Sequence, residues 1–285
     1  MSCGDGGRTD LSPLALERAR YRRSRAHRST LVALLSTLVF AGAAVAAIVA
    51  SPGWPRVRAT FLDPAIALSS FPAVLEGLWL NVRVLVVAEI GILVVGLGIA
   101  MLRTLRGPVF FPVRALATGY VDLFRGVPLL IALYLIGFGL PALRLQGIPT
   151  DTAVLGTITL ILVYSAYVAE VFRAGIESVH PSQRAAARSL GLSHRQSMRL
   201  VILPQAVRRV LPPLLNDFVA LQKDVGLISV LGAVDAIRAA QIESARSFNF
   251  TPYVVAALLF VLLAIPTGRI ADALAARAAR REGAA

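Results

Sequence analysis

The sequence predicts an all-α polytopic membrane protein with about six transmembrane helices. Its 285 residues are 56% hydrophobic and have a mean hydropathy of +0.71. Only 16% of them are charged, whereas soluble domains usually contain roughly 25% charged residues. Several nearly uncharged windows approach the ~20 apolar residues that a helix needs to cross a bilayer. Basic residues gather between these windows in a pattern that is typical of membrane topology.

The first apolar segment, residues 31–50, follows a basic tail at residues 1–30 that contains seven arginines. A cleaved signal peptide is the alternative interpretation, because it also places basic residues before apolar ones. The apolar part of a signal peptide usually has only about 7–15 residues, which is shorter than this segment. We therefore expect an additional, retained first helix with the N-terminal tail in the cytoplasm.

Five further apolar segments follow along the chain. Asp217, Lys223 and Asp224 interrupt the fourth of these five, which makes it the weakest prediction of a span. Proline and glycine residues between the segments indicate turns. The five segments cover approximately residues 71–102, 126–143, 152–172, 209–232 and 252–268.

The distribution of basic residues predicts the orientation. With six spans, the segments on the N-terminal side of the membrane hold 21 basic residues, and the segments on the other side hold 5. Basic residues concentrate in cytoplasmic loops, so both termini and residues 173–208 are expected in the cytoplasm. The net charge of +13 is then explained by topology, and nucleic-acid binding is not needed to account for it.

Residues 177–205 form a polar insert with local helix signals. Pro181 and Ser182 suit a helix start, and the alanines at 185–187 are strong helix formers. Gly191 suits the left-handed residue that ends a helix. Ser193 and Gln196 match a capping box for a second helix, which is expected to stop at Leu203-Pro204. An amphipathic loop on the membrane surface is the alternative.

The spacing of these residues resembles the EAA loop of bacterial ABC importer permeases. The pattern of that loop is matched by three alanines, then Gly191, then Val201-Ile-Leu-Pro204. In that family, the loop couples to a separate ATPase subunit. This chain departs from the pattern at Ala185, where the family usually has Glu, and losing that capping partner weakens the helix start by several tenths of a kcal/mol. The resemblance implies a coupling role for Ser182, Ala185, Ala186, Ala187, Gly191, Leu203 and Pro204.

Other segments resemble permeases for polar amino acids, and the likeness extends from about residue 71 to residue 269. The segments are FRGVPLL at 124–130, AYVAEVFRAGI at 166–176, LPQA at 203–206, PLLN at 213–216 and QKDVGL at 222–227. The resemblance implies a permease transmembrane domain at 71–270 that contains the coupling loop, followed by a cytoplasmic tail at 271–285.

The sequence offers no catalytic or metal-binding constellation. ATP hydrolysis needs a phosphate-binding loop that ends in Gly-Lys-Ser/Thr, but the only lysine, Lys223, follows Gln222. ATP and magnesium are therefore expected to be used by a partner ATPase, with no cofactor bound by this chain. His27, His180 and His194 lack metal-ligand spacing and are interpreted as surface residues. Cys3 is the only cysteine, so no disulfide is possible within the chain.

Charged residues inside spans are costly and usually functional. An amino acid carries an ammonium and a carboxylate, so a transport path needs complementary charges. Asp122 and Arg125, beside Gly126 and Pro128, are the first choice, although Glu170 could instead pair locally with Arg173. The predicted pathway residues are Asp122, Arg125, Gly126, Pro128, Glu170, Asn216, Lys223 and Asp224.

The sequence therefore predicts the permease subunit of a bacterial ABC importer for polar amino acids, in the inner membrane. Its expected partners are an ABC ATPase, a second permease subunit (itself or a sister) and an extracytoplasmic substrate-binding protein. Two alternatives stay open. One is an ion-coupled secondary transporter that uses Asp122 or Glu170, and the other is an assembly or regulatory subunit without transport activity.

Overall fold

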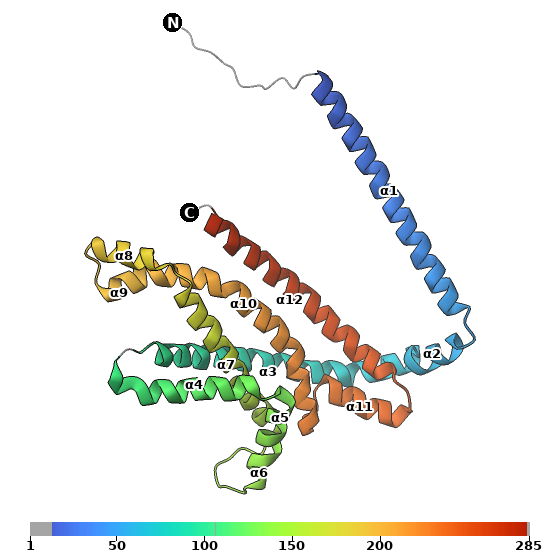
Figure 1. Ribbon diagram of the computed structural model, residues 1–285. Helices are drawn as coiled ribbons and strands as arrows, with labels where there is room; N and C mark the ends of the chain where they lie inside the picture. Colours follow the sequence, from blue (N-terminus) through green and yellow to red (C-terminus); the bar gives the residue numbers. More distant parts are fainter. Residues whose placement is uncertain (1–12, 106, 284–285) are drawn as a thin grey trace. The chain divides into compact units, whose positions relative to one another are not determined.

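The computed structural model describes residues 13–105 and 107–283, which contain helices and connecting segments but no strand. The chain divides into two compact units, Met1–Ala59 and Thr60–Ala285. The helices of both units are labelled in Figure 1.

The first unit is dominated by one long helix, α1 (Pro13–Val49). Its apolar part, Val32–Val49, has a mean hydropathy of 2.5. This part confirms the expected first apolar helix. The helix begins well before it, so the basic segment from Pro13 onward continues the same helix, while residues 1–12 lie outside the described residues. The short helix α2 (Trp54–Phe61) follows.

The second unit is built around α3 (Pro64–Thr104), a helix of 41 residues. Asp63 caps its start by accepting hydrogen bonds from the backbone N–H groups of Ala65 (2.9 Å) and Ile66 (3.2 Å). Pro64 occupies the first turn, where its missing N–H costs nothing. α3 packs lengthwise against α7 (Thr152–Glu177) through a core of buried apolar side chains.

The segment predicted as the third span is broken. η1 (Pro108–Phe110) and α4 (Phe111–Gly126) form one arm, and α5 (Leu129–Tyr134), η2 (Leu135–Gly139) and α6 (Leu140–Ala142) form the other. The two arms meet at an angle of 106°. Pro128 causes the break, because a proline disfavours helical geometry in the residue before it, and Val127 is extended (φ −92°, ψ 127°). Residues 126–143 are therefore one arm of a bent pair and not a straight span.

The chain then forms α8 (Pro181–Ser189), α9 (His194–Ser197), η3 (Met198–Ile202), α10 (Leu203–Asp224) and η4 (Val225–Leu231). After a bend of 51°, it continues as α11 (Ala236–Ser247), a helix that the sequence interpretation missed. α12 (Thr251–Gly283) completes the unit.

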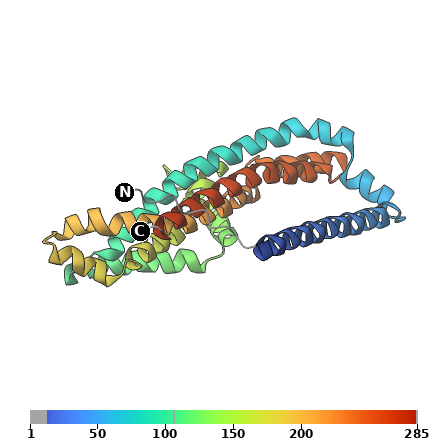
Figure 2. The ribbon, with the colours of Figure 1, turned by 90° about the horizontal axis from the view of Figure 1, so that it is seen from above.

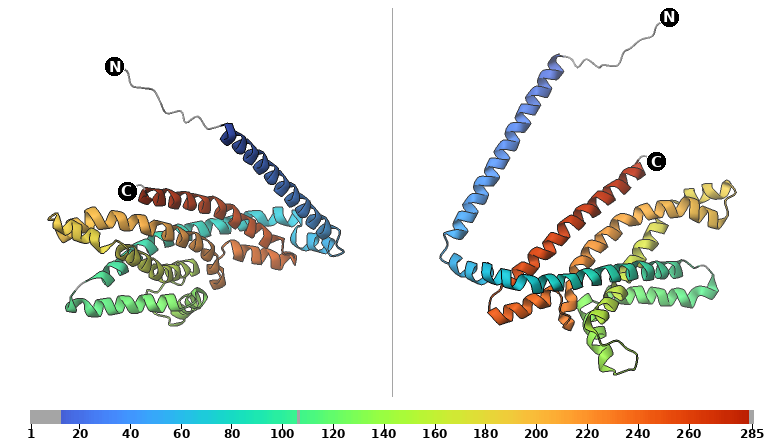
Figure 3. Two further views of the ribbon diagram at one scale, coloured as in Figure 1. Left: turned by 45° about the horizontal axis from the view of Figure 1, so that its top comes forward. Right: turned by 180° about the vertical axis from the view of Figure 1, so that it is seen from behind.

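Among the described residues, four helices are long and apolar enough to cross a membrane, or up to six if each bent pair is one span. This range agrees with the prediction of about six. Within the second unit, α8 and α9 lie at one end of the long helices and α11 lies at the other (Figures 2 and 3).

Candidate functional site

The insert between α7 and α10 folds as the predicted helix–Gly–helix module, which we call the coupling module (residues 177–205). Gly191 adopts the left-handed conformation (φ 78°) that ends α8. Ser193 and Gln196 form the capping box: the Ser193 N–H donates to Gln196 Oε1 (2.9 Å), and the Gln196 N–H donates to Ser193 Oγ (3.3 Å). His180 has a role that the sequence interpretation missed, because its side chain caps α8 by accepting from the Ser182 N–H (3.2 Å).

The second helix of the module does not stop at Leu203-Pro204 as predicted. α9 passes through one π turn, η3, directly into α10. The Leu203 N–H donates to the Met198 carbonyl, five residues back. A proline inside a helix removes one hydrogen bond and clashes with the carbonyl four residues earlier, and the wider π turn accommodates Pro204 next to it. α9, η3 and α10 therefore form one continuous helical rod.

The coupling module exposes apolar side chains on a polar background. Leu190 is 80% exposed, Leu200 62% and Leu203 47%. Of the three alanines, Ala187 is buried within the chain, whereas Ala185 and Ala186 are exposed. Ser182, Gly191 and Pro204 are also exposed. Exposed apolar side chains within an otherwise polar segment are typical of a docking surface.

The base of the module is held between the end of α7 and the start of α10. Val179, Ile202 and Ala206 form a small buried core there. Gly175 allows the two helices to approach closely, because a Cβ at this position would overlap Val210. The Arg209 guanidinium also donates to the backbone carbonyl and to the hydroxyl of Ser178, at the end of α7.

Glu170, one of the predicted pathway residues, lies in an ion-pair network near this base. Its carboxylate accepts from Arg103 on α3 (2.7 Å) and from Arg173 one turn further along α7. Arg173 also pairs with Glu177. The network therefore connects α3 to the segment of α7 that leads into the coupling module, and the local Glu170–Arg173 pairing that was considered from the sequence is present.

A second feature is a cleft of about 400 Å³ beside the break between α4 and α5, which we call the central cleft. Three elements line it: the α4–α5 turn, α7 and α10. Four predicted pathway residues meet here, although they come from segments about 100 residues apart. The residues that line the cleft are Arg125, Gly126, Val127, Pro128, Leu129, Val163, Tyr164, Tyr167, Asp217, Ala220 and Asp224.

The central cleft contains both signs of charge and two phenols. The Tyr164 hydroxyl donates to Asp224 Oδ2 (2.6 Å). The Arg125 guanidinium lies 5.8 Å from the centre of the Tyr167 ring, within the range of a cation–π contact. Asp217 Oδ2 is buried and has no hydrogen-bond partner among the described residues. A buried acceptor of this kind is costly unless a ligand or water satisfies it.

The other predicted pathway residues lie elsewhere. Asp122, Asn216 and Lys223 are exposed, and none of them lines the central cleft. The sequence interpretation missed Tyr164 and Tyr167, although two tyrosines three residues apart on a helix that also carries charge were a usable signal. Among the described residues, no group of acidic, histidine or cysteine side chains could hold a metal ion.

These features together define a class of protein. A bundle of apolar helices with a charged cleft and a partly apolar module at one end is consistent with a membrane permease. Residues 92–280 match the model of the family described as binding-protein-dependent transport system inner membrane component.

Curated relatives and a solved structure agree with this match. The chain is 36% identical to the "probable glutamine ABC transporter permease protein GlnM" of Bacillus subtilis, over 72% of this chain and 93% of the relative. It is 31% identical to the "arginine transport system permease protein ArtQ" of the same organism, over 72% and 91%. A crystal structure of "an amino acid ABC transporter with histidines" superposes with a TM-score of 0.70 at 33% identity, over 76% of this chain and 99% of the other.

The chain therefore belongs to the family of binding-protein-dependent transport system inner membrane components. It is a membrane permease subunit of an ABC importer, and the ATPase of such importers is a separate subunit.

Proposed function

We propose that this chain forms the translocation pathway for polar amino acids in the inner membrane, with the coupling module and both termini in the cytoplasm. The central cleft is the observation that carries the proposal. A polar amino acid needs an anionic partner for its ammonium and a cationic partner for its carboxylate. The cleft provides Asp217 and Asp224 on α10 and Arg125 at the end of α4.

The printed names of the relatives support the substrate class. One relative is named for glutamine and another for arginine, and the structural neighbour is described as an amino acid transporter. These substrates share the α-ammonium and α-carboxylate and differ in side-chain charge. The unpaired carboxylate of Asp217 supports recognition of a donor group, which all of these substrates have.

The coupling module supports a partner ATPase that uses ATP and magnesium. Leu190, at the end of α8, is 80% exposed, and burial in a partner's cleft would remove its side chain from water. Fully burying one leucine contributes about 1.5–3 kcal/mol. The rod from α9 to α10 then carries a movement of the module to Asp217 and Asp224 in the central cleft. A second permease subunit and an extracytoplasmic binding protein complete the proposed importer.

The test is uptake of labelled polar amino acids into proteoliposomes that contain this chain, the candidate ATPase and the candidate binding protein. The informative variant is Leu190→Ser, because a side chain this exposed contributes little to the fold. We expect ATP-dependent uptake by the wild type and a loss of at least about tenfold in the variant, which corresponds to about 1.4 kcal/mol of binding. Leu145→Ser changes an equally apolar, 59% exposed side chain away from the module and should leave uptake unchanged.

Uptake that persists without ATP, or that is equal in the two leucine variants, would contradict the proposal. Uptake that instead collapses with the ion gradient would favour the ion-coupled alternative, and ATPase binding without any uptake would favour the assembly subunit.

A further inference from the structure

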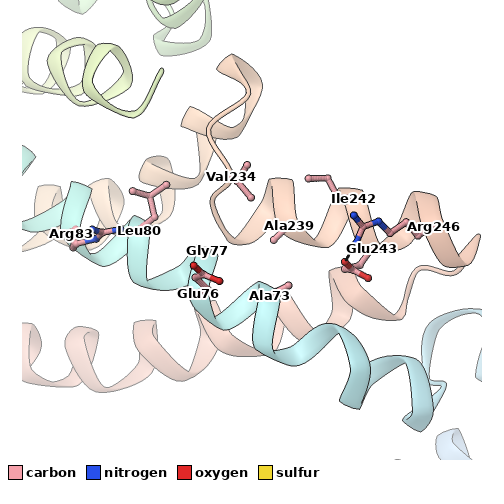
Figure 4. A pocket seen from close by; sticks show the side chains of 10 residues that line it. All are labelled: Ala73, Glu76, Gly77, Leu80, Arg83, Val234, Ala239, Ile242, Glu243 and Arg246. Atoms are coloured by element: carbon pink, nitrogen blue, oxygen red, sulfur yellow. Dashed lines mark hydrogen bonds and ion pairs between the residues drawn. The ribbon is translucent and has the colours of Figure 1, made fainter. Parts of the chain in front are cut away.

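A second cleft, of about 340 Å³, lies between α3 and α11 (Figure 4). α11 is at the end of the unit away from α8 and α9 (Figure 1). Two helices from distant parts of the sequence each supply one acidic and one basic side chain to it. α3 provides Glu76 and Arg83, and α11 provides Glu243 and Arg246. Leu80, Val234 and Ile242 add an apolar part to the lining. We call this the α3–α11 cleft.

The walls of the α3–α11 cleft are fixed by close packing. A Cβ on Gly77 would lie 2.5 Å from the Ala236 backbone nitrogen, so only glycine allows this approach of α3 to the start of α11. Asn81 is fully buried beside it, donates to Asp235 Oδ2 (3.0 Å) and accepts from the Ala236 N–H (3.1 Å). The charged side chains are therefore held on a rigid frame.

The charges in this cleft are balanced but only half of them are paired. Glu243 and Arg246 form an ion pair of 2.8 Å on α11. Glu76 and Arg83 make no ion pair or hydrogen bond within the described part of the chain. They are seven residues apart on α3, so they lie on the same face and about 10 Å apart along the helix axis. One unpaired carboxylate and one unpaired guanidinium are thus presented to the same space.

The position of Arg83 places this cleft at the outer edge of the membrane in the proposed orientation. Between Arg83 and Arg103, the 19 residues of α3 contain only one charge, Glu89. Twenty residue steps of helix extend about 30 Å, the thickness of the hydrocarbon core. Arg103 belongs to the network near the coupling module, so Arg83 marks the opposite interface. Glu76 lies about two helical turns further toward water.

A ligand with a single charge would satisfy only one of the two unpaired groups, and an apolar ligand would satisfy neither. A small molecule that carries both charges satisfies both, and the cleft volume is at the lower end of the range for small-molecule sites. We infer that the α3–α11 cleft is a binding site for a zwitterionic amino acid, in which Glu76 holds the ammonium and Arg83 holds the carboxylate. The inference rests on the proposed function and adds to it a receiving site separate from the central cleft.

The chain carries its own reporter for this test. Trp79 is 61% exposed and lies on α3 three residues after Glu76 and four before Arg83, so it neighbours both side chains. The only other tryptophan is Trp54. In a Trp54→Phe permease reconstituted without ATPase or binding protein, the fluorescence of Trp79 reports this cleft and not the central one.

The probe is L-glutamine, because its side chain is uncharged. 4-Aminobutanamide lacks the carboxylate and glutaramic acid lacks the ammonium. We expect a saturable change in Trp79 fluorescence with glutamine and binding weaker by about tenfold with either analogue, since each loses one bond to a charged group. Glu76→Gln and Arg83→Gln should each weaken glutamine binding by a similar factor. Arg238→Gln, the same change on α11 outside the cleft, should not alter it.

Equal responses to glutamine and both analogues, or a response that survives Glu76→Gln and Arg83→Gln, would overturn the inference. Uptake by the complete importer is measured in parallel with the same Trp54→Phe chain. Normal uptake without a change in Trp79 fluorescence would contradict the receiving site alone and would leave the proposed transport function standing. A change in Trp79 fluorescence without uptake would support the site and contradict the proposed transport function. The binding protein alone could also change the fluorescence of Trp79. If that change persisted in Arg83→Gln, this surface would be assigned to protein docking, and the inference would be overturned.

Discussion

Gly175 on α7 faces Val210 on α10 so closely that a Cβ at position 175 would overlap the valine side chain. This contact joins the helix that enters the coupling module to the helix that leaves it. The Arg209–Ser178 hydrogen bonds lie next to it. The module is therefore attached to the membrane helices through one tightly packed crossing.

The first prediction concerns this crossing. Gly175→Ala should destabilise the protein by about 1–3 kcal/mol, the usual cost of forcing atoms into a packed site. Adding Val210→Ala should restore most of that loss, because it removes the overlapping methyl groups. Thermal unfolding in detergent measures both effects. Gly98→Ala is the matched control, since a Cβ there meets nothing within 4 Å; a Gly175→Ala protein as stable as this control would refute the packing argument.

The second prediction concerns the ion-pair network near the module. Glu170 contacts two guanidinium groups, and its side chain is only 23% exposed. Glu170→Gln should therefore cost more stability than Arg103→Gln, with the larger effect about 1–3 kcal/mol. The double variant should lose less than the sum of the single losses, because the two residues share one interaction. Additive losses in thermal unfolding would show that the α3–α7 contact does not depend on this pair.

The third prediction concerns the central cleft. Tyr164→Phe removes the hydroxyl that donates to Asp224 and leaves the carboxylate without that partner. We expect uptake at low substrate concentration to fall by about tenfold, as for the loss of a hydrogen bond to a charged group. Tyr134→Phe, which changes a half-exposed tyrosine outside the cleft, should have no such effect. Similar uptake by the two variants would argue against a role for Asp224 in the pathway.

The fourth prediction concerns the cap of α8. His180→Ala should lower the local stability of α8 by about 0.5–2 kcal/mol, the usual value of a side-chain cap. Hydrogen exchange of the amides at residues 182–185 should then become faster. His180→Asn retains a good capping side chain and should keep the slow exchange. Equally fast exchange in both variants would mean that the histidine ring does not cap this helix.

The sequence was sufficient where structure depends on near neighbours. The apolar segments at 31–50, 71–102 and 152–172 all lie largely within helices long and apolar enough to cross a membrane. The sequence also predicted the end of α8 at Gly191 and the capping box that follows it. Both depend on residues no more than a few positions apart.

The sequence was insufficient where structure depends on distant contacts. The proline at 128 was visible, but the 106° break depends on how the two arms pack. α11 was not predicted because three charged residues, Arg238, Glu243 and Arg246, make its segment too polar to resemble a membrane span, although most of its alanines are buried. The hydrogen bond between Tyr164 and Asp224 joins positions 60 residues apart, and no local pattern reveals such a pairing.

The uninterrupted helical path from His194 to Asp224 has a thermodynamic consequence. It runs for about 45 Å from the exposed module to the central cleft, with a π turn and no loop between them. If occupancy at one end changes affinity at the other, reciprocity requires the same factor in both directions. An amino acid in the cleft must then alter the affinity of the module for its ATPase by the same factor by which the ATPase alters the affinity of the cleft for the amino acid. In the proposed importer, the same rod would then carry the effect of ATP to the cleft and the effect of a bound amino acid to the ATPase.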